Sequence, residues 1–175
     1  MNCIWSIDNV LTVLSIVLAI IGGTFAYIQW KSANKLKRSE FINQIIDKLR
    51  FDKDLVKTMY LIEYDYSWYS EKFHSSDKEL EYEVDKLLSY LSYICYVNKL
   101  KIISKKEFSI LQYELNRTCS SPAVQCYLWN LYHFSKSQNT KCTFHYLIEY
   151  GTTNKIINKE FYNKMSTHYS KYLNF

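Results

Sequence analysis

The chain has 175 residues, which suits one domain plus an accessory segment, and it contains 17 Tyr and 9 Phe but only 3 Gly and 1 Pro. So few turn-forming and helix-breaking residues argue against a fold of many short strands and favour long helices. The formal net charge of +5 is small and dispersed. It excludes a nucleic-acid-binding tail, and we expect no direct binding to nucleic acid.

The first predicted element is a membrane-spanning helix. Residues 10–30 carry no charge, and as a helix they extend about 32 Å, which is enough to cross a bilayer core. A signal peptide needs basic residues before its apolar run, whereas residues 1–9 contain Asp8 and no Lys or Arg. Trp5, Tyr27 and Trp30 stand where the two interfaces would be. These features favour an uncleaved anchor over the alternative of a buried core helix.

Basic residues follow the apolar run, and they predict its orientation. They are Lys31, Lys35, Lys37 and Arg38. The positive-inside tendency places residues 1–9 outside the cell inner membrane and the chain from Lys31 onward in the cytoplasm. From residue 31 onward, 22 basic side chains face 16 acidic ones, a balance that also suits contact with anionic membrane lipid.

Small residues recur along one side of the predicted span: Ser15, Ala19, Gly22, Gly23 and Ala26. Small residues four apart let helix backbones approach closely in lipid, so we expect a homo-oligomer. Such residues also occur in passive single-pass anchors, and that alternative stays open. The segment holds no ionisable residue that would mark an ion path.

A basic, amphipathic helix is expected over residues 31–50, continuous with the span. Its apolar stripe comprises Phe41, Ile42, Ile45, Ile46 and Leu49. A further helix begins near Asp54, and its apolar side comprises Leu55, Val56, Met59, Tyr60 and Ile62.

Later helices are predicted from their capping residues. Ser76 with Glu79 forms a capping box ahead of a helix over residues 77–98. The inner face of that helix is expected to be Leu80, Val84, Leu87, Leu88, Leu91, Ile94 and Cys95. Ser104 with Glu107 repeats the box before a helix that carries Phe108, Leu111 and Leu115.

Three more signals organise the carboxy-terminal part. Ser121 and Pro122 suit the N-cap and first position of a helix. Gly151 suits the stop of a short helix, and Asn158 suits the cap of a last helix. That last helix would carry Phe161, Tyr162, Met165 and Tyr169.

Together these patterns predict an all-α protein in four parts: a short extracytoplasmic terminus (1–9), a transmembrane helix (10–30), a juxtamembrane helix (31–50) and a cytoplasmic helical bundle (51–175). No stretch shows sustained strand alternation.

Catalytic motifs are absent from the sequence, which has no glycine-rich phosphate loop, no G-x-S-x-G and no H-E-x-x-H. An acidic run, residues 62–86, contains eight carboxylates: Glu63, Asp65, Glu71, Asp77, Glu79, Glu81, Glu83 and Asp85. Such a run can support acid–base chemistry or hold a cation, but it more often forms a solvated helix face. We therefore predict no enzymatic activity, with a membrane-bound hydrolase or nuclease as the least favoured alternative.

Cysteine and histidine side chains cluster within 27 residues: Cys119, Cys126, His133, Cys142 and His145. Zinc needs four such groups to converge, and this spacing matches no known ligand pattern. The chain has five cysteines, an odd number at irregular spacing, which indicates reduced thiols in a cytosolic domain. We expect neither a metal nor a cofactor.

A basic set of residues offers a candidate site for an anionic ligand: Lys99, Lys101, Lys105, Lys106 and Arg117. With Tyr96 and Tyr113 nearby in sequence, these cations suit a phosphate-bearing molecule such as a nucleotide second messenger. The alternatives are a surface held to the inner leaflet and a merely soluble face.

Several segments resemble a group of small bacterial single-span proteins with a helical cytoplasmic domain of unassigned function (DUF4760-like). These segments are RSEFI (38–42), DKLLSYL (85–91) and YLWNLYHF (127–134), together with the anchor and its basic stop. The resemblance implies no catalytic residues. It points to accessory-genome proteins, some of which, in similar architectures, are membrane effectors of phage defence.

The sequence thus favours a non-enzymatic membrane effector or signalling protein that self-associates on a signal, either a protein partner or an anionic small molecule. A constitutive membrane adaptor that tethers a soluble partner is the alternative.

Overall fold

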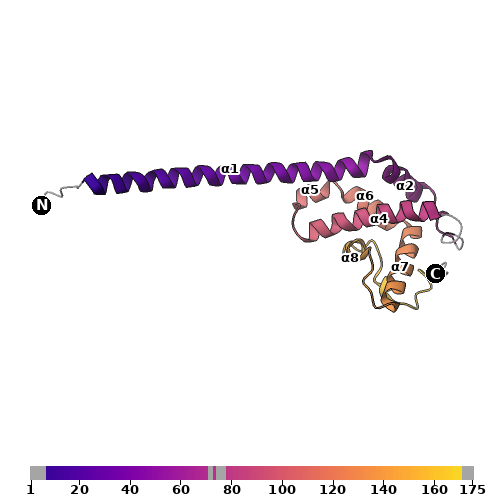
Figure 1. Cartoon of the computed structure of the whole chain (residues 1–175). Coiled ribbons are helices and arrows are strands. Elements are labelled where there is room, and N and C mark those ends of the chain that lie inside the picture. Colours follow the sequence, from indigo (N-terminus) through magenta and orange to yellow (C-terminus); the bar gives the residue numbers. More distant parts are fainter. Residues whose placement is uncertain (1–6, 71–72, 74–77, 171–175) are drawn as a thin grey trace. The chain divides into compact units, whose positions relative to one another are not determined.

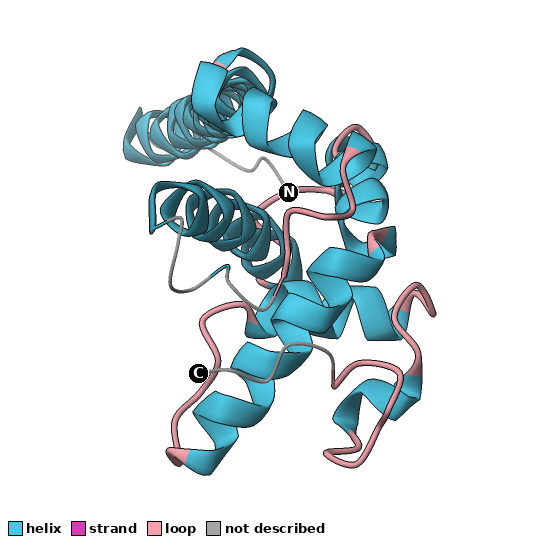
Figure 2. Ribbon diagram, turned by 90° about the vertical axis from the view of Figure 1, so that its right-hand side faces the viewer, coloured by secondary structure: helices cyan, strands magenta, loops and turns pink. Residues whose placement is uncertain are grey.

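The structure is a computed structural model, and it describes residues 7–70, 73 and 78–170. Within these ranges every regular element is a helix, as Figure 2 shows, which confirms the all-α prediction. The described chain forms two compact units, one ending at Phe41 and one beginning at Ile42. Four residues to which the sequence assigns a role lie outside the described residues: Trp5, Glu71, Ser76 and Asp77.

Helix α1 (Ile7–Phe51) contains the whole predicted span. By length and composition it is able to cross a membrane, and all side chains of residues 7–37 are exposed. The hydroxyl groups of Thr12, Ser15 and Thr24 donate to carbonyls one turn earlier, so these polar groups are satisfied inside the helix. The helix is unbroken because residues 24–50 contain no Pro or Gly.

The last turns of α1 belong to the second unit. Ile42, Ile45 and Leu49 are buried, whereas Phe41 and Ile46 are half-buried, so the predicted stripe is present.

Helix α2 (Lys53–Tyr64) begins after Asp52, whose carboxylate accepts hydrogen bonds from the backbone of Asp54 and Leu55. Leu55, Met59 and Ile62 are buried as predicted, and Val56 is half-buried. Tyr60 is exposed, which corrects its assignment to the inner face.

Helix α4 (Lys78–Lys99) is the central helix of the second unit and packs against α2 and α8, as Figure 1 shows. Its predicted inner face is buried from Val84 to Cys95, and only Leu80 is half-buried. The helix ends where Lys101 adopts a left-handed φ of 58° and the Ile102 amide donates to the Val97 carbonyl.

The capping box of Ser104 and Glu107 is present, but it opens only a short helix, α5 (Lys105–Ser109). A separate helix, α6 (Gln112–Ser120), follows, so the single helix expected here is divided. Phe108, Leu111 and Leu115 are nevertheless all buried. Because two short helices bury these side chains, their spacing alone does not distinguish one helix from two.

Helix α7 (Pro122–Ser137) begins as predicted, with Ser121 at the N-cap and Pro122 at the first position. The Ser121 side chain makes no capping hydrogen bond. Helix α8 (His145–Thr153) continues through Gly151, which corrects the prediction that Gly151 ends it. A Cβ at Gly151 would lie 2.5 Å from Cδ1 of Ile157, so the glycine allows close packing there.

Asn158 caps the final element as predicted, because its side chain accepts a hydrogen bond from the Glu160 amide. That element is a single 3₁₀ turn, η1 (Lys159–Tyr162), instead of the expected longer helix. Met165 is exposed and Tyr169 is buried, so the tail packs through tertiary contacts without helical periodicity.

Candidate ligand-binding pocket

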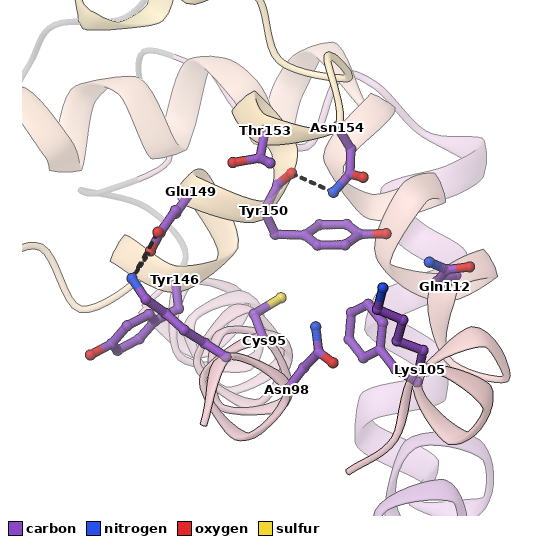
Figure 3. A pocket seen from close by; sticks show the side chains of 11 residues that line it. Cys95, Asn98, Lys105, Gln112, Tyr146, Glu149, Tyr150, Thr153 and Asn154 are labelled. Carbon is purple, nitrogen blue, oxygen red and sulfur yellow. Dashed lines mark hydrogen bonds and ion pairs between the residues drawn. The ribbon is translucent and has the colours of Figure 1, made fainter. Parts of the chain in front are cut away.

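A cavity of about 420 Å³ lies among α4, α5, α6 and α8. Such a volume is typical of sites for small molecules. Figure 3 shows the side chains that line it; besides Cys95 and Thr153, they are of three kinds. The charged ones are Lys99, Lys105 and Glu149, the amides are Asn98, Gln112 and Asn154, and the aromatic ones are Phe108, Tyr146 and Tyr150.

One of the two pocket lysines is neutralised and the other is not. Lys99 Nζ donates to both carboxylate oxygens of Glu149, each at 2.7 Å, and it lies 5.5 Å from the ring centre of Tyr146. Among the described residues, no carboxylate pairs with Lys105. The pocket therefore carries one unbalanced positive charge, on Lys105.

Tyr150 forms an aromatic wall of the pocket. Its hydroxyl donates to Asn116 Oδ1 at 2.7 Å, and its ring makes an edge-to-face contact with that of Phe108 at a centroid distance of 5.7 Å. Burial raises the pKa of Tyr150 to about 12, so its hydroxyl is protonated at neutral pH. A fixed, neutral ring of this kind offers a surface on which a planar group can stack.

The amides supply polar groups at the edge of that wall. In Figure 3 the Asn98 and Lys105 side chains point towards the ring of Tyr150. Asn154 donates to the Tyr150 carbonyl at 2.8 Å. Within the described ranges, the side chains of Asn98 and Gln112 have no hydrogen-bond partner. Both can therefore donate to and accept from a ligand.

Cys95 also lines the pocket, and burial raises the pKa of its thiol. The thiol is therefore protonated at neutral pH and is a poor nucleophile.

The structure divides the predicted basic set. Lys99 and Lys105 line the pocket, Lys106 is exposed beside it, and Lys101 occupies the left-handed end of α4. Arg117 lies elsewhere, in an ion pair with Glu63. Its guanidinium is 5.5 Å from the ring centre of Tyr60 and 5.9 Å from that of Tyr113. Tyr96 packs on Tyr146 at a centroid distance of 4.7 Å.

Sequence reasoning did not select Tyr150, Asn98 or Gln112. No motif marks them, because they belong to three different helices, α4, α6 and α8, which only tertiary packing brings to one pocket. Of the two aromatic residues predicted beside the basic set, Tyr113 contacts Arg117 away from the pocket, and Tyr96 packs on the pocket residue Tyr146.

Acidic side chains of residues 62–86 take part in structural contacts. Asp85 accepts a hydrogen bond from the buried Tyr127 hydroxyl at 2.6 Å, and Glu83 pairs with Lys57 at 3.4 Å. Glu63 pairs with Arg117.

The clustered cysteine and histidine residues also have separate environments. His133 Nε2 lies 3.1 Å from the Phe161 carbonyl, and His145 lies 3.7 Å from Glu149. Cys119, Cys126 and Cys142 are buried. The part of the chain that the structure describes contains no group of three or more acidic, His or Cys side chains able to hold a metal ion.

No protein-family model matches the chain, and no curated protein or solved structure matches it either. The resemblance to DUF4760-like proteins stays a prediction.

Proposed function

We propose that this protein is a non-enzymatic, inner-membrane effector or signalling protein that self-associates through α1 when its helical domain binds a signal. The observation that carries the proposal is the complete exposure of an uncharged run in α1, residues 10–30. Leaving apolar surface in water costs about 25 cal/mol per Å², so lipid or other copies of the helix must cover this run.

The small-residue side of α1 supports self-association. A Cβ at Gly22 or Gly23 would meet no atom within 4 Å, so both backbone positions are open to a second helix. The Ser15 hydroxyl already donates to the Leu11 carbonyl at 2.8 Å, and it can enter an apolar interface without an unsatisfied donor.

The pocket supports an anionic small molecule as the signal, because Lys105 leaves it with one unbalanced positive charge. The basic residues Lys31, Lys35 and Lys37 are exposed and support a cytoplasmic location for the second unit. The cellular setting that we propose is phage defence, where an assembled anchor would disturb the membrane. That setting rests on the resemblance in sequence pattern alone.

The experiment is inducible expression of the full chain in a bacterium, with membrane potential followed by a voltage-sensitive dye. We expect depolarisation by the wild-type chain and its loss in Gly22→Leu/Gly23→Leu, at equal amounts in the membrane fraction. Val17→Leu/Ile21→Leu is the matched control, because at about 100° per residue these positions lie on the opposite side of the helix. Equal depolarisation by both double variants would show that assembly through the glycines is not the mechanism.

A second candidate function, a membrane adaptor, is favoured by an exposed aromatic patch formed by Tyr60, Tyr64 and Tyr113 around Arg117. Tyrosine and arginine are, with tryptophan, the residues enriched among the hot spots of protein interfaces. An adaptor would retain its partner in the Gly22→Leu/Gly23→Leu variant. It would lose the partner in Tyr60→Ser/Tyr113→Ser, as measured by quantitative co-purification of the full chain from membranes.

A further inference from the structure

The pocket has a positive end that can bind one phosphate group. Of the two lysines that line the pocket, Lys105 has no carboxylate partner in the described part of the chain, whereas Lys99 is held by both oxygens of Glu149 at 2.7 Å. A lysine ammonium binds phosphate oxygens through charge-assisted hydrogen bonds. A single available cation suits a monophosphate better than a polyphosphate, whose several charges would need several partners.

Beside Lys105, the lining around Tyr150 has the chemistry of a base-binding site. Tyr150 offers a ring face held in place by its hydrogen bond to Asn116, and nearby Asn98 and Gln112 offer amides that no side chain or backbone group of the described residues binds. Proteins recognise isolated bases by aromatic stacking combined with hydrogen bonds to the polar edge of the base. An amide presents a donor and an acceptor side by side, which matches the adjacent acceptors and donors of that edge.

We infer that this pocket binds a nucleoside monophosphate, with the base against Tyr150 and hydrogen-bonded by Asn98 and Gln112, and the phosphate on Lys105. The cavity of about 420 Å³ accommodates one nucleotide. This inference rests on the proposed function, because it names the chemical class of the anionic signal. Binding itself requires no assembly of α1.

The test is isothermal titration calorimetry on the full chain in detergent micelles, with AMP, GMP, CMP and UMP as probes. We expect at least one to bind, with affinity lowered about ten-fold or more in Lys105→Met, since a hydrogen bond to a charged group is lost. Lys106→Met is the matched control: it removes a neighbouring exposed ammonium that does not line the pocket, and we expect it to bind like the wild type. Gln112→Met replaces an exposed amide at nearly constant size and should weaken binding of the same nucleotide.

Two smaller probes separate the parts of the site and the possible sources of phosphate. Adenosine carries a base without phosphate, and glycerol 3-phosphate carries the phosphate of a lipid headgroup without a base. Both should bind more weakly than the best nucleotide. Equal or tighter binding of glycerol 3-phosphate would overturn the inference in favour of a lipid headgroup site. Absence of binding by all four nucleotides, or equal losses in Lys105→Met and Lys106→Met, would also overturn it.

The outcomes distinguish this inference from the proposed function. A chain that depolarises the membrane but binds none of the four nucleotides overturns the pocket assignment alone. A chain that binds a nucleotide through Lys105 but never depolarises the membrane, with or without that nucleotide, overturns the assembly mechanism alone.

Discussion

Arg50 and Glu114, 64 positions apart in the sequence, form an ion pair in which Arg50 Nε donates to a Glu114 carboxylate oxygen at 2.9 Å. Arg50 Nη2 also donates to the Ile110 carbonyl at 3.1 Å. Glu114 is only 6% exposed. Three residues later on α6, Arg117 pairs with Glu63 of α2. Helix α6 contributes the carboxylate to the first pair and the guanidinium to the second. Sliding α6 along its neighbours would therefore bring like charges together, so the two pairs fix its register.

Removing the arginine that pairs with the buried Glu114 should destabilise the protein. Arg50→Met leaves the Glu114 carboxylate buried without a counter-charge, and we expect a loss of about 2–4 kcal/mol in the free energy of unfolding. Urea unfolding of the full chain in detergent measures this, followed by the fluorescence of the buried Trp68 and Trp129. Lys57→Met is the control, because it breaks an exposed pair with Glu83 and should cost less than about 1 kcal/mol. Equal losses would contradict the importance of burial.

A methyl group at Gly151 should strain the packing of α8. Gly151→Ala places Cβ 2.5 Å from Cδ1 and 2.8 Å from Cγ1 of the buried Ile157, and we expect a loss of about 1–3 kcal/mol. Ile157→Val removes the nearer atom. The double variant should therefore lose less than the sum of the two single changes, measured as urea midpoints in a double-mutant cycle. Strict additivity would show that the two side chains do not meet.

Glycine should stabilise the left-handed helix ends. Lys155 follows α8 with a φ of 59°, a conformation that costs a residue with a Cβ about 1–2 kcal/mol. Because glycine also loses more entropy on folding, we expect a net gain of up to about 1 kcal/mol for Lys155→Gly. Lys136→Gly, in the last turn of α7, should instead lose about 0.5–1 kcal/mol. The same sign for both changes, in matched urea titrations, would refute this explanation.

His133 should make stability depend on pH. Burial lowers its pKa, and the hydrogen bond to the Phe161 carbonyl only partly opposes this effect. The unfolded chain therefore binds the proton more readily. Stability is complete above the usual histidine pKa, about 6.5, and falls as the pH drops below it.

Urea midpoints at pH 7.5 and pH 5.5 measure this dependence. His133→Gln should reduce the difference between the two midpoints, since glutamine does not titrate. His145→Gln is the companion variant, because burial and Lys141 also lower the pKa of His145, although that side chain is more exposed. We expect the larger effect from His133, and the reverse order would contradict the role of burial.

Features that depend on neighbours within one or two helical turns were predictable from the sequence. The continuity of α1, the capping box at Ser104, the start of α7 at Pro122 and the inner face of α4 are of this kind. Each follows from residue spacing, from a cap or from the absence of a helix breaker, and none requires knowledge of a distant contact.

Only the tertiary structure decided which of those local signals end or begin a helix, and which side chains from different helices form the pocket. Gly151 is a residue type that often ends a helix, yet it lies inside α8. There the side chain of Ile157 leaves no room for a Cβ. The pocket joins Lys99 to Glu149 across 50 positions and Tyr150 to Asn116 across 34. Periodicity reports only which side of a helix is apolar. Which helices meet depends on the packing of all the apolar sides at once. That packing places Tyr150 in the same pocket as Lys105 and Arg117 away from it.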